Sequence, residues 1–276
     1  MVGRVKPLLT LALAMVLASG NAFAATPADA IWLMGEVHDN PQAHQQRYAR
    51  IQTQVQAGWR PSLVMEQFDR EHQALLNEGL AQCQNADCLV SMAGLEPWDW
   101  QHYKPLLQLA LDHDLPVLAG NVSRRDVNKV IQQGYQAVFE PALIARYGLQ
   151  NPLPESLLHT HVTNIVNGHC KLLPANVAQS MVPAQVARDV WMAHVVQTQA
   201  AQGPVVLVAG NGHVDKSVGV PQWLPAELQP RVRVYGFVEQ PNLGSVSYDE
   251  AVRVLPAERE DPCIAFRQSM ERMQHQ

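Results

Sequence analysis

Apolar residues along the chain gather in short continuous runs, separated by longer segments with the spacing of helices. Strands are predicted at 30–34, 62–65, 116–119, 204–209 and 231–238, with a shorter one at 251–255. A short run that is apolar throughout is typical of a strand buried on both faces. Helices predicted at 41–57, 70–80 and 106–113 alternate with the first strands. The pattern predicts an α/β fold with a mostly parallel sheet covered by helices on both faces.

The stretch from about 123 to 202 has no convincing strand pattern. Helices are predicted there at 135–147, 155–166 and 184–200. We therefore expect a helical subdomain or cap, inserted into one α/β domain that runs from 25 to 276.

The N-terminus has the three-part pattern of a secretory signal peptide. Arg4 and Lys6 precede an apolar run at 8–19, and Ala22-Phe23-Ala24 fits the small-x-small rule for cleavage. The run is shorter than the roughly 20 apolar residues that span a bilayer. We expect residues 1–24 to be removed, no transmembrane segment later in the chain, and a periplasmic location.

The charge and the cysteine content indicate which partners and which oxidation state of the cysteines to expect. The net charge is −5 without a basic stripe, which argues against a nucleic-acid partner. Four cysteines lie at 83, 88, 170 and 263, and an even set in an oxidising compartment favours two disulfides. Cys83 and Cys88 are close enough to close a small loop, which would leave Cys170 with Cys263. Three pairings are possible, and a zinc site is a weaker alternative because the second pair is far apart.

Polar and ionisable residues follow four of the predicted strands. They are Glu36 and His38 after the first strand, Glu66 after the second, Asn121 and then Arg124 after the third, and Asn211 and His213 after the fourth. Ligands of open parallel sheets bind beyond these strand ends, and unpaired buried charge is costly. Turn formation and helix capping are the alternative explanation, above all for Asp39 and Asn40.

Two Gly-x-x-His motifs, at 35–38 and 210–213, together with Glu66 resemble a superfamily that includes Tiki and TraB proteins, erythromycin esterases and ChaN-like haem-uptake proteins. The ChaN-like branch is the most similar, over nearly the whole mature chain. The matching stretches are GEVHDNPQAH (35–44), MEQFD (65–69), WDWQHYKP (98–105), GHC (168–170), RDVWMA (188–193) and AGNGHVDKSVGVP (209–221). The chain departs from the pattern where Asp215 precedes Lys216, and it lacks the lipoprotein cysteine of many members.

This resemblance implies haem binding for iron acquisition in the periplasm, with possible homodimer formation around haem and contacts with a haem-uptake receptor or transporter. An axial ligand and groups for the propionates are then needed. Tyr103 is the first axial candidate, with His102 and Lys104 as propionate contacts; core packing is the alternative role of Tyr103. His159, His161 and His169 are expected to be surface or structural residues.

Hydrolysis is the alternative function, because wider relatives resemble hydrolases. Glu36, His38, Glu66 and His213 are then the candidate catalytic residues. His38, Glu66 and His213 are candidate ligands for a divalent metal such as Mn or Zn, with a free carboxylate as general base. The chain lacks the His-Glu-x-x-His and Gly-x-Ser-x-Gly motifs, and Asp215 stands where a dinucleotide fingerprint needs glycine.

Overall fold

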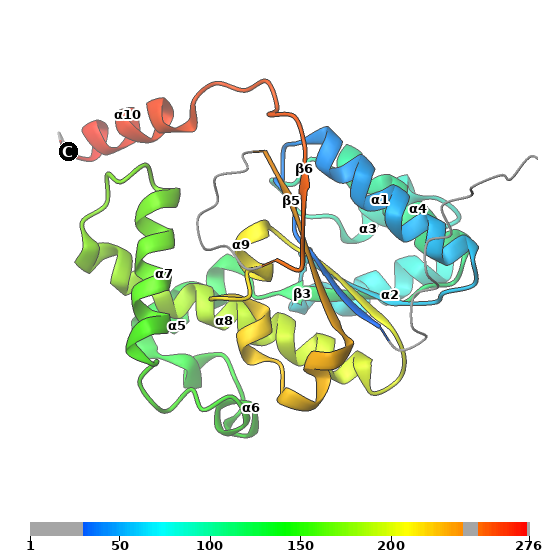
Figure 1. Ribbon diagram of the computed structural model, residues 1–276, viewed down its shortest axis with the longest axis horizontal. Coiled ribbons are helices and arrows are strands. Elements are labelled where there is room, and N and C mark those ends of the chain that lie inside the picture. The colour runs from blue at the N-terminus through cyan, green and yellow to red at the C-terminus, as the bar shows by residue number, and fades with distance from the viewer. Residues whose placement is uncertain (1–29, 240–247, 275–276) are drawn as a thin grey trace, which may run out of the picture.

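The computed structural model describes residues 30–239 and 248–274 (Figure 1). The predicted signal peptide, 1–24, lies outside the described residues. Within the described part of the chain, no helix has the length and apolar character needed to cross a membrane.

A six-stranded parallel sheet forms the centre of the molecule, with the strand order β3-β2-β4-β1-β5-β6. The strands are β1 (Ile31–Met34), β2 (Ser62–Asp69), β3 (Val117–Asn121), β4 (Val205–Val208), β5 (Val232–Val238) and β6 (Glu250–Arg253). The predicted strands and the α/β class are confirmed. The predicted end of the second strand was wrong, because β2 continues to Asp69 and its register against β3 shifts after Met65. Glu66 therefore lies inside a strand.

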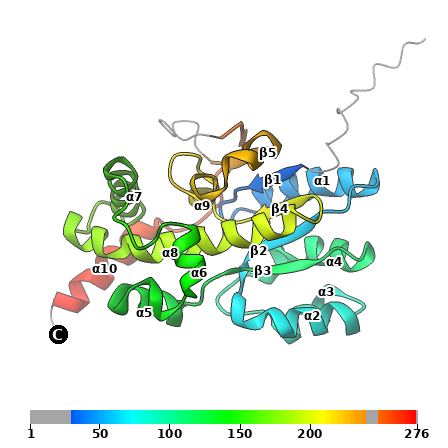
Figure 2. The same ribbon diagram turned by 90° about the horizontal axis from the view of Figure 1, so that it is seen from below.

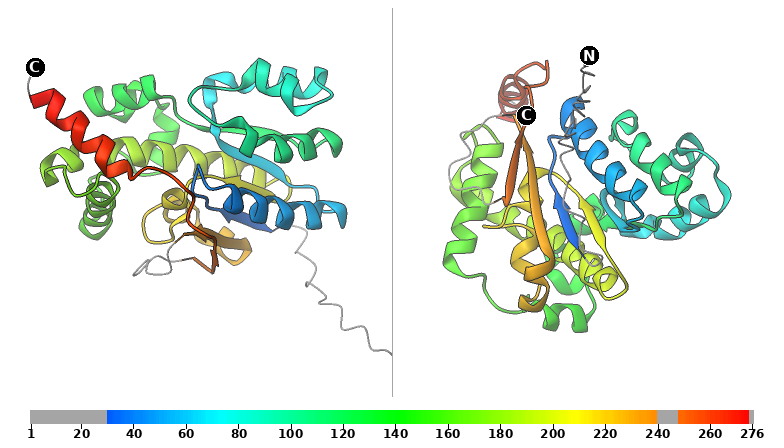
Figure 3. Two further views of the ribbon diagram at one scale, coloured as in Figure 1. Left: turned by 90° about the horizontal axis from the view of Figure 1, so that it is seen from above. Right: turned by 45° about the vertical axis from the view of Figure 1, so that its right-hand side comes forward.

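Side chains alternate between the two faces of each strand, and each face has its own helices. Trp32 and Met34 pack with helices α1 (Pro41–Gln56), α2 (Gln73–Gln82), α3 (Ala86–Ala93) and α4 (Lys104–Asp112). Ile31 and Leu33 face the other way and pack against the second half of α8 (Ala175–Ala200). Figures 2 and 3 show these helices on opposite sides of the sheet. Both faces are covered, as the apolar strands predict.

The entry into α1 is fixed by its first residues. The Asn40 side chain accepts a hydrogen bond from the Ala43 backbone N–H at 2.9 Å, and Pro41 occupies the first helical turn. Gly58 follows the helix with a φ of +101°, which glycine adopts without strain. Local features therefore define both ends of α1: the Asn40 cap at its start and the Gly58 turn after its end.

The region between β3 and β4, residues 122–204, contains helices joined by turns and no strand. It contains α5 (Arg124–Gln133), the 3₁₀ helix η3 (Tyr135–Ala137), α6 (Pro141–Arg146), α7 (Glu155–Gly168) and α8. These helices have a core of their own, which includes Val127, Ile165 and Val186. The helical insertion over about 123–202 stays a proposal, and the second half of α8 also packs against the sheet.

One predicted helix, 135–147, was wrong. Pro141 cannot continue a helix from the preceding turn, and it drives Glu140 into an extended conformation with a ψ of 148°. The segment therefore divides into η3 and α6. Helix α8 begins nine residues before its predicted start at 184, because it accommodates Pro183 in its interior.

Two disulfides, Cys83–Cys88 and Cys170–Cys263, join the four cysteines. This is the pairing favoured by spacing, and it leaves no free cysteine for a zinc site. Cys170–Cys263 attaches the last helix, α10 (Pro262–Gln274), to the end of α7. No described side chain of α10 is buried, and its ring contact is Phe266 with His169 at 5.4 Å. The disulfide is therefore the main attachment of this helix.

The variant C170S/C263S should lose its C-terminal helix to limited trypsin digestion far faster than the wild type. Exposed Arg267 and Arg272 become cleavable once α10 detaches, because local opening then costs little free energy. The melting temperature should also fall, because this disulfide joins residues 93 positions apart and its loss frees the unfolded chain. The variant C83S/C88S is the matched control and should protect α10 as the wild type does; equal cleavage in all three proteins would contradict this role.

Candidate functional site

The two Gly-x-x-His loops interlock at the carboxyl ends of β1 and β4, which are neighbours in the sheet. A Cβ atom on Gly35 would collide with Asn211 Oδ1 and lie 2.7 Å from Val214 Cγ2. A Cβ atom on Gly210 would lie 3.0 Å from His38 Nε2. Gly35 therefore leaves room for the second motif, and any larger residue at 210 would displace the ring of His38.

Glu36 is the centre of the first loop and is 2% exposed. Its Oε1 atom meets His38 Nδ1 at 3.0 Å, the Tyr103 hydroxyl at 2.5 Å and Gln67 Nε2 at 3.2 Å. Its Oε2 atom forms an ion pair with Arg47. One oxygen of the carboxylate thus has three hydrogen-bond partners, and the charge is balanced by a guanidinium at the other oxygen.

The contact between Glu36 and His38 is made by a turn. β1 ends at Met34, so both residues lie beyond the strand, as their order in the sequence predicts. A backbone hydrogen bond from Asn40 N–H to the Val37 carbonyl, at 3.0 Å, closes the turn that brings the two side chains together.

Arg47 and His44 lie on the buried side of α1 and contact this loop. Burial lowers the pKa of Arg47 to about 10, so it remains a cation at neutral pH. Burial lowers the pKa of His44 to about 4, so that imidazole is neutral. His44 Nδ1 accepts from Arg47 at 2.9 Å, and Nε2–H donates to the His38 carbonyl at 2.9 Å. The backbone of His38 is therefore fixed as well as its ring.

A second charged group contains Glu66, His213 and Asp189. His213 Nδ1 lies 2.6 Å from Asp189 Oδ1, and Nε2 lies 3.5 Å from Glu66 Oε1. Burial works to lower the pKa of His213, but the charges of Glu66 and Asp189 outweigh it and raise that pKa to about 10. Burial opposes ionisation of Glu66, yet His213 lowers the pKa of Glu66 to about 2. Gly210 N–H also donates to Glu66 Oε2 at 2.7 Å.

These charges do not support the candidate metal set His38, Glu66 and His213. A metal ligand must be a neutral imidazole, whereas His213 is an imidazolium with both nitrogens directed at carboxylates. Within residues 30–239 and 248–274, no group of three or more His, Cys, Asp or Glu is arranged to hold a metal ion. The Mn or Zn prediction is therefore not supported.

A cavity of about 590 Å³ opens beside His38, and we call it the strand-end cavity. His38 stands edge-on to Trp98, with ring centroids 5.0 Å apart. The lining residues are His38, Asp39, Asp69, Leu95, Glu96, Pro97, Trp98, Asp99, His102, Asn121, Arg124 and Arg188. The cavity combines an imidazole, apolar surface and two guanidinium groups, within the usual volume range of small-molecule sites, ~300–1,000 Å³.

The three predicted haem contacts occupy different places. Tyr103 is 1% exposed and donates to Glu36, and burial raises the pKa of its hydroxyl, so it remains a phenol. His102 lines the cavity and stacks on His44 with centroids 4.6 Å apart. Lys104 pairs with Asp87 at 2.6 Å and does not line the cavity. Ligation by Tyr103 stays a prediction, but the hydroxyl already has a buried partner.

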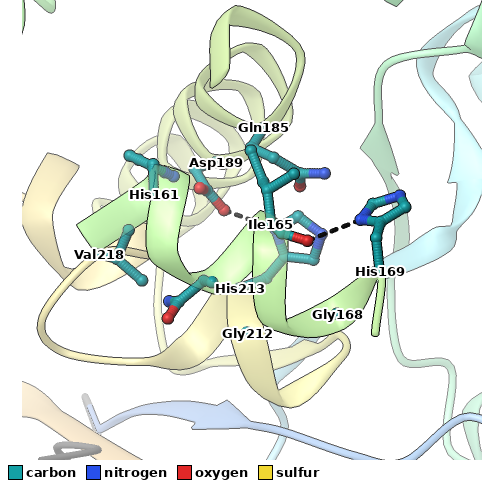
Figure 4. A pocket seen from close by; sticks show the side chains of 10 residues that line it. His161, Ile165, Gly168, His169, Gln185, Asp189, Gly212, His213 and Val218 are labelled. Carbon is teal, nitrogen blue, oxygen red and sulfur yellow. Dashed lines mark hydrogen bonds and ion pairs between the residues drawn. The ribbon is translucent and has the colours of Figure 1, made fainter. Parts of the chain in front are cut away.

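A second cavity, of about 220 Å³, is lined by Asp189 and His213 (Figure 4). His161 of α7 and His169, which directly follows α7, line it as well. Burial lowers the pKa of His161 to about 4. His169 is partly exposed, and its Nδ1 lies 2.7 Å from the Ile165 carbonyl oxygen. His161 is therefore buried near His213, whereas His169 lies at the end of the helix.

Sequence reasoning missed Arg47 and Asp189 as parts of the site. Arg47 interrupts an apolar helical stripe formed by Ala43, Ile51 and Val55. A charge at such a position signals a buried partner. Asp189 follows the same rule between Val186 and Val190 of α8.

Comparisons with known proteins agree with this architecture. The model of the family described as haem-binding uptake, Tiki superfamily, ChaN matches residues 23–224. The ChaN protein of Campylobacter jejuni, whose structure concerns cofacial haem binding, is similar with a TM-score of 0.62 and 18% identity, over 80% of this chain and 84% of that chain. An erythromycin esterase in its open conformation has a TM-score of 0.43 and 12% identity, over 78% and 74% of the two chains. No curated protein matches the chain.

His213→Gln should lower the free energy of unfolding by about 3–5 kcal/mol, because it leaves two buried carboxylates without their cation. The raised pKa of His213 also sets a pH dependence. Its contribution is complete below pH 6.5 and is lost as pH rises towards about 10. Urea denaturation from pH 6 to 10 should show this decline in the wild type and not in the variant. The variant His159→Gln is the control, because it changes an exposed histidine. A wild-type free energy of unfolding that does not change up to pH 10 would contradict the raised pKa of His213.

Proposed function

This chain belongs to the haem-binding uptake family of the Tiki superfamily that includes ChaN, and on that premise we propose that it binds haem as cargo in the strand-end cavity. The observation that carries the proposal is the position of His38. It lines a cavity with apolar walls, and its ring is held by a buried carboxylate. Haem proteins use an imidazole in this way as an axial ligand of iron.

The contact with Glu36 makes His38 suitable for iron. A carboxylate can only accept, so His38 Nδ1 carries the proton that it donates to Glu36 Oε1. Nε2 then keeps its lone pair. A histidine ligand whose other nitrogen donates to a carboxylate is fixed in orientation and is more basic. The side chain of His38 is 46% exposed, so a ligand can reach it from the cavity.

The walls of the cavity fit a large planar ligand. Trp98, Pro97 and Leu95 supply apolar surface beside His38, and His102 lies on the same wall. Aromatic surface contributes strongly to the binding of flat apolar ligands. Tyr103 acts in this proposal as a positioning residue, because its hydroxyl holds the oxygen of Glu36 that also orients His38.

We further propose that the protein works in the periplasm in haem uptake or storage. The signal-peptide pattern at 1–24 and the two disulfides support an oxidising compartment outside the cytoplasm. Homodimer formation around haem and contact with a receptor or transporter are part of the same proposal.

A hemin titration should give a saturable Soret band at near-integral stoichiometry. His38→Ala should lose or shift the band, whereas Tyr103→Phe should keep it with weaker binding, by up to about 10-fold, since an outer partner of the histidine is lost. His159→Ala, on the exposed side of α7, is the control and should behave as the wild type. Retention of the band in His38→Ala with its loss in Tyr103→Phe would transfer the ligand role to Tyr103.

Hydrolysis remains a second candidate function because of one specific arrangement. Glu36 and His38 form a carboxylate–imidazole dyad whose free nitrogen can take a proton from water, as a general base does. The His213 imidazolium lies on the other side of Glu66 and supplies a fixed positive charge nearby. Glu66 completes the predicted catalytic set and, in this scheme, holds His213 protonated.

Activity on a panel of p-nitrophenyl esters and phosphates tests this candidate. The hydrolase account predicts turnover that disappears in His38→Ala and is inhibited by hemin, since both need the same nitrogen. Turnover unchanged in His38→Ala would show that the dyad is not responsible. No turnover on any substrate would leave haem binding as the function of the cavity.

A further inference from the structure

Two arginines of the strand-end cavity differ from the neighbouring arginines because they form no ion pair with a described residue. Arg125 pairs with Glu71 and Asp126, both at 3.5 Å, and Arg70 pairs with Asp126 at 2.8 Å. In the described part of the chain, Arg124 and Arg188 form no hydrogen bond or ion pair, although both line the cavity. They come from different elements, since Arg124 begins α5 and Arg188 lies in α8.

The carboxylates of the same cavity make no direct contact with these two cations. Asp39 pairs with Arg259 at 3.1 Å, and Asp69 accepts from the Asn121 side chain at 3.0 Å while it interacts electrostatically with Arg188. Asp99 accepts from the Gln101 backbone N–H at 3.1 Å and faces His102 at 3.6 Å. Glu96 is exposed to solvent and forms no ion pair within the described residues. The hydrogen-bonding groups of both guanidiniums are therefore available to a ligand.

We propose that Arg124 and Arg188 form a carboxylate subsite, which receives the propionate groups of haem bound at His38. Haem carries two carboxylates on one edge of an apolar ring. The cavity has the complementary arrangement, with apolar surface and an imidazole from one set of residues and two unpaired guanidinium groups from another. A guanidinium fork binds a carboxylate through two hydrogen bonds, which gives orientation as well as affinity.

This inference rests on the proposed function and makes it more specific. Lys104, the earlier candidate for propionate contact, is paired with Asp87. The inference assigns this role to Arg124, which follows the third strand, and to Arg188, which lies in the RDVWMA stretch. It also predicts selectivity. A tetrapyrrole with free carboxylates should bind better than the same ring with those carboxylates esterified.

Comparison of hemin with hemin dimethyl ester tests the subsite, because both carry the same ring and iron. The wild type should bind hemin more tightly than the ester, by about tenfold for each guanidinium contact, and the difference should shrink at high salt. The double variant R124Q/R188Q should bind hemin only as well as the ester, with its affinity for the ester unchanged. Arg125→Gln, whose side chain is 71% exposed and already paired, is the matched control.

The outcomes separate the two claims. Equal affinity of the wild type for hemin and ester, or hemin binding unchanged in R124Q/R188Q, overturns the subsite and leaves haem binding intact. Parallel loss of hemin and ester in the double variant also overturns it, because a carboxylate contact cannot affect the ester. Failure of the wild type to bind either compound removes the proposed function, and the subsite with it.

Discussion

The arrangement of this site depends on burying two carboxylates at the carboxyl ends of parallel strands. Glu36 follows β1 and Glu66 lies in β2, and an unpaired buried charge would cost several kcal/mol. Each has its own cation: Arg47 rises from α1 to Glu36, and His213 comes from the end of β4 to Glu66. Asp189 of α8 holds His213 from its other side. Helix α1 on one face of the sheet and helix α8 on the other are therefore both connected to these buried charges.

This pairing gives the two Gly-x-x-His motifs different chemistry although they look alike in sequence. His213 lies between two carboxylates, so its pKa rises and it carries a positive charge at neutral pH. His38 donates to Glu36, whose charge is already balanced by Arg47, and its half-exposed side chain lines the cavity. One histidine is thus structural and the other is suited to bind iron or accept a proton. This difference explains why a shared metal site is not supported, and why His38 is the residue that we propose as the axial ligand.

The sequence predicted the features that follow from local pattern. Wholly apolar runs located the sheet, and the position of Glu36 and His38 after β1 located the cavity. Contacts between elements that are far apart in the sequence could not be predicted from local pattern. The side chain of Tyr103 turns to Glu36 because the segment before α4 packs against α1, and no periodicity encodes that choice. Arg188 falls within the helix predicted at 184–200, but its place at the cavity depends on how α8 packs against β2 and β3, which a local pattern does not encode.

The central claim is that the strand-end carboxylates fix the protonation of the two motif histidines. Long-range ¹H–¹⁵N spectra of the histidine side chains, assigned by substitution and recorded across pH, test it directly. We predict that His213 keeps protons on both nitrogens until the pH approaches its pKa of about 10, and that the Nδ1 atom of His38 carries the proton donated to Glu36. Loss of a proton from His213 near pH 6.5, or a His38 ring without a proton on Nδ1, would contradict the account.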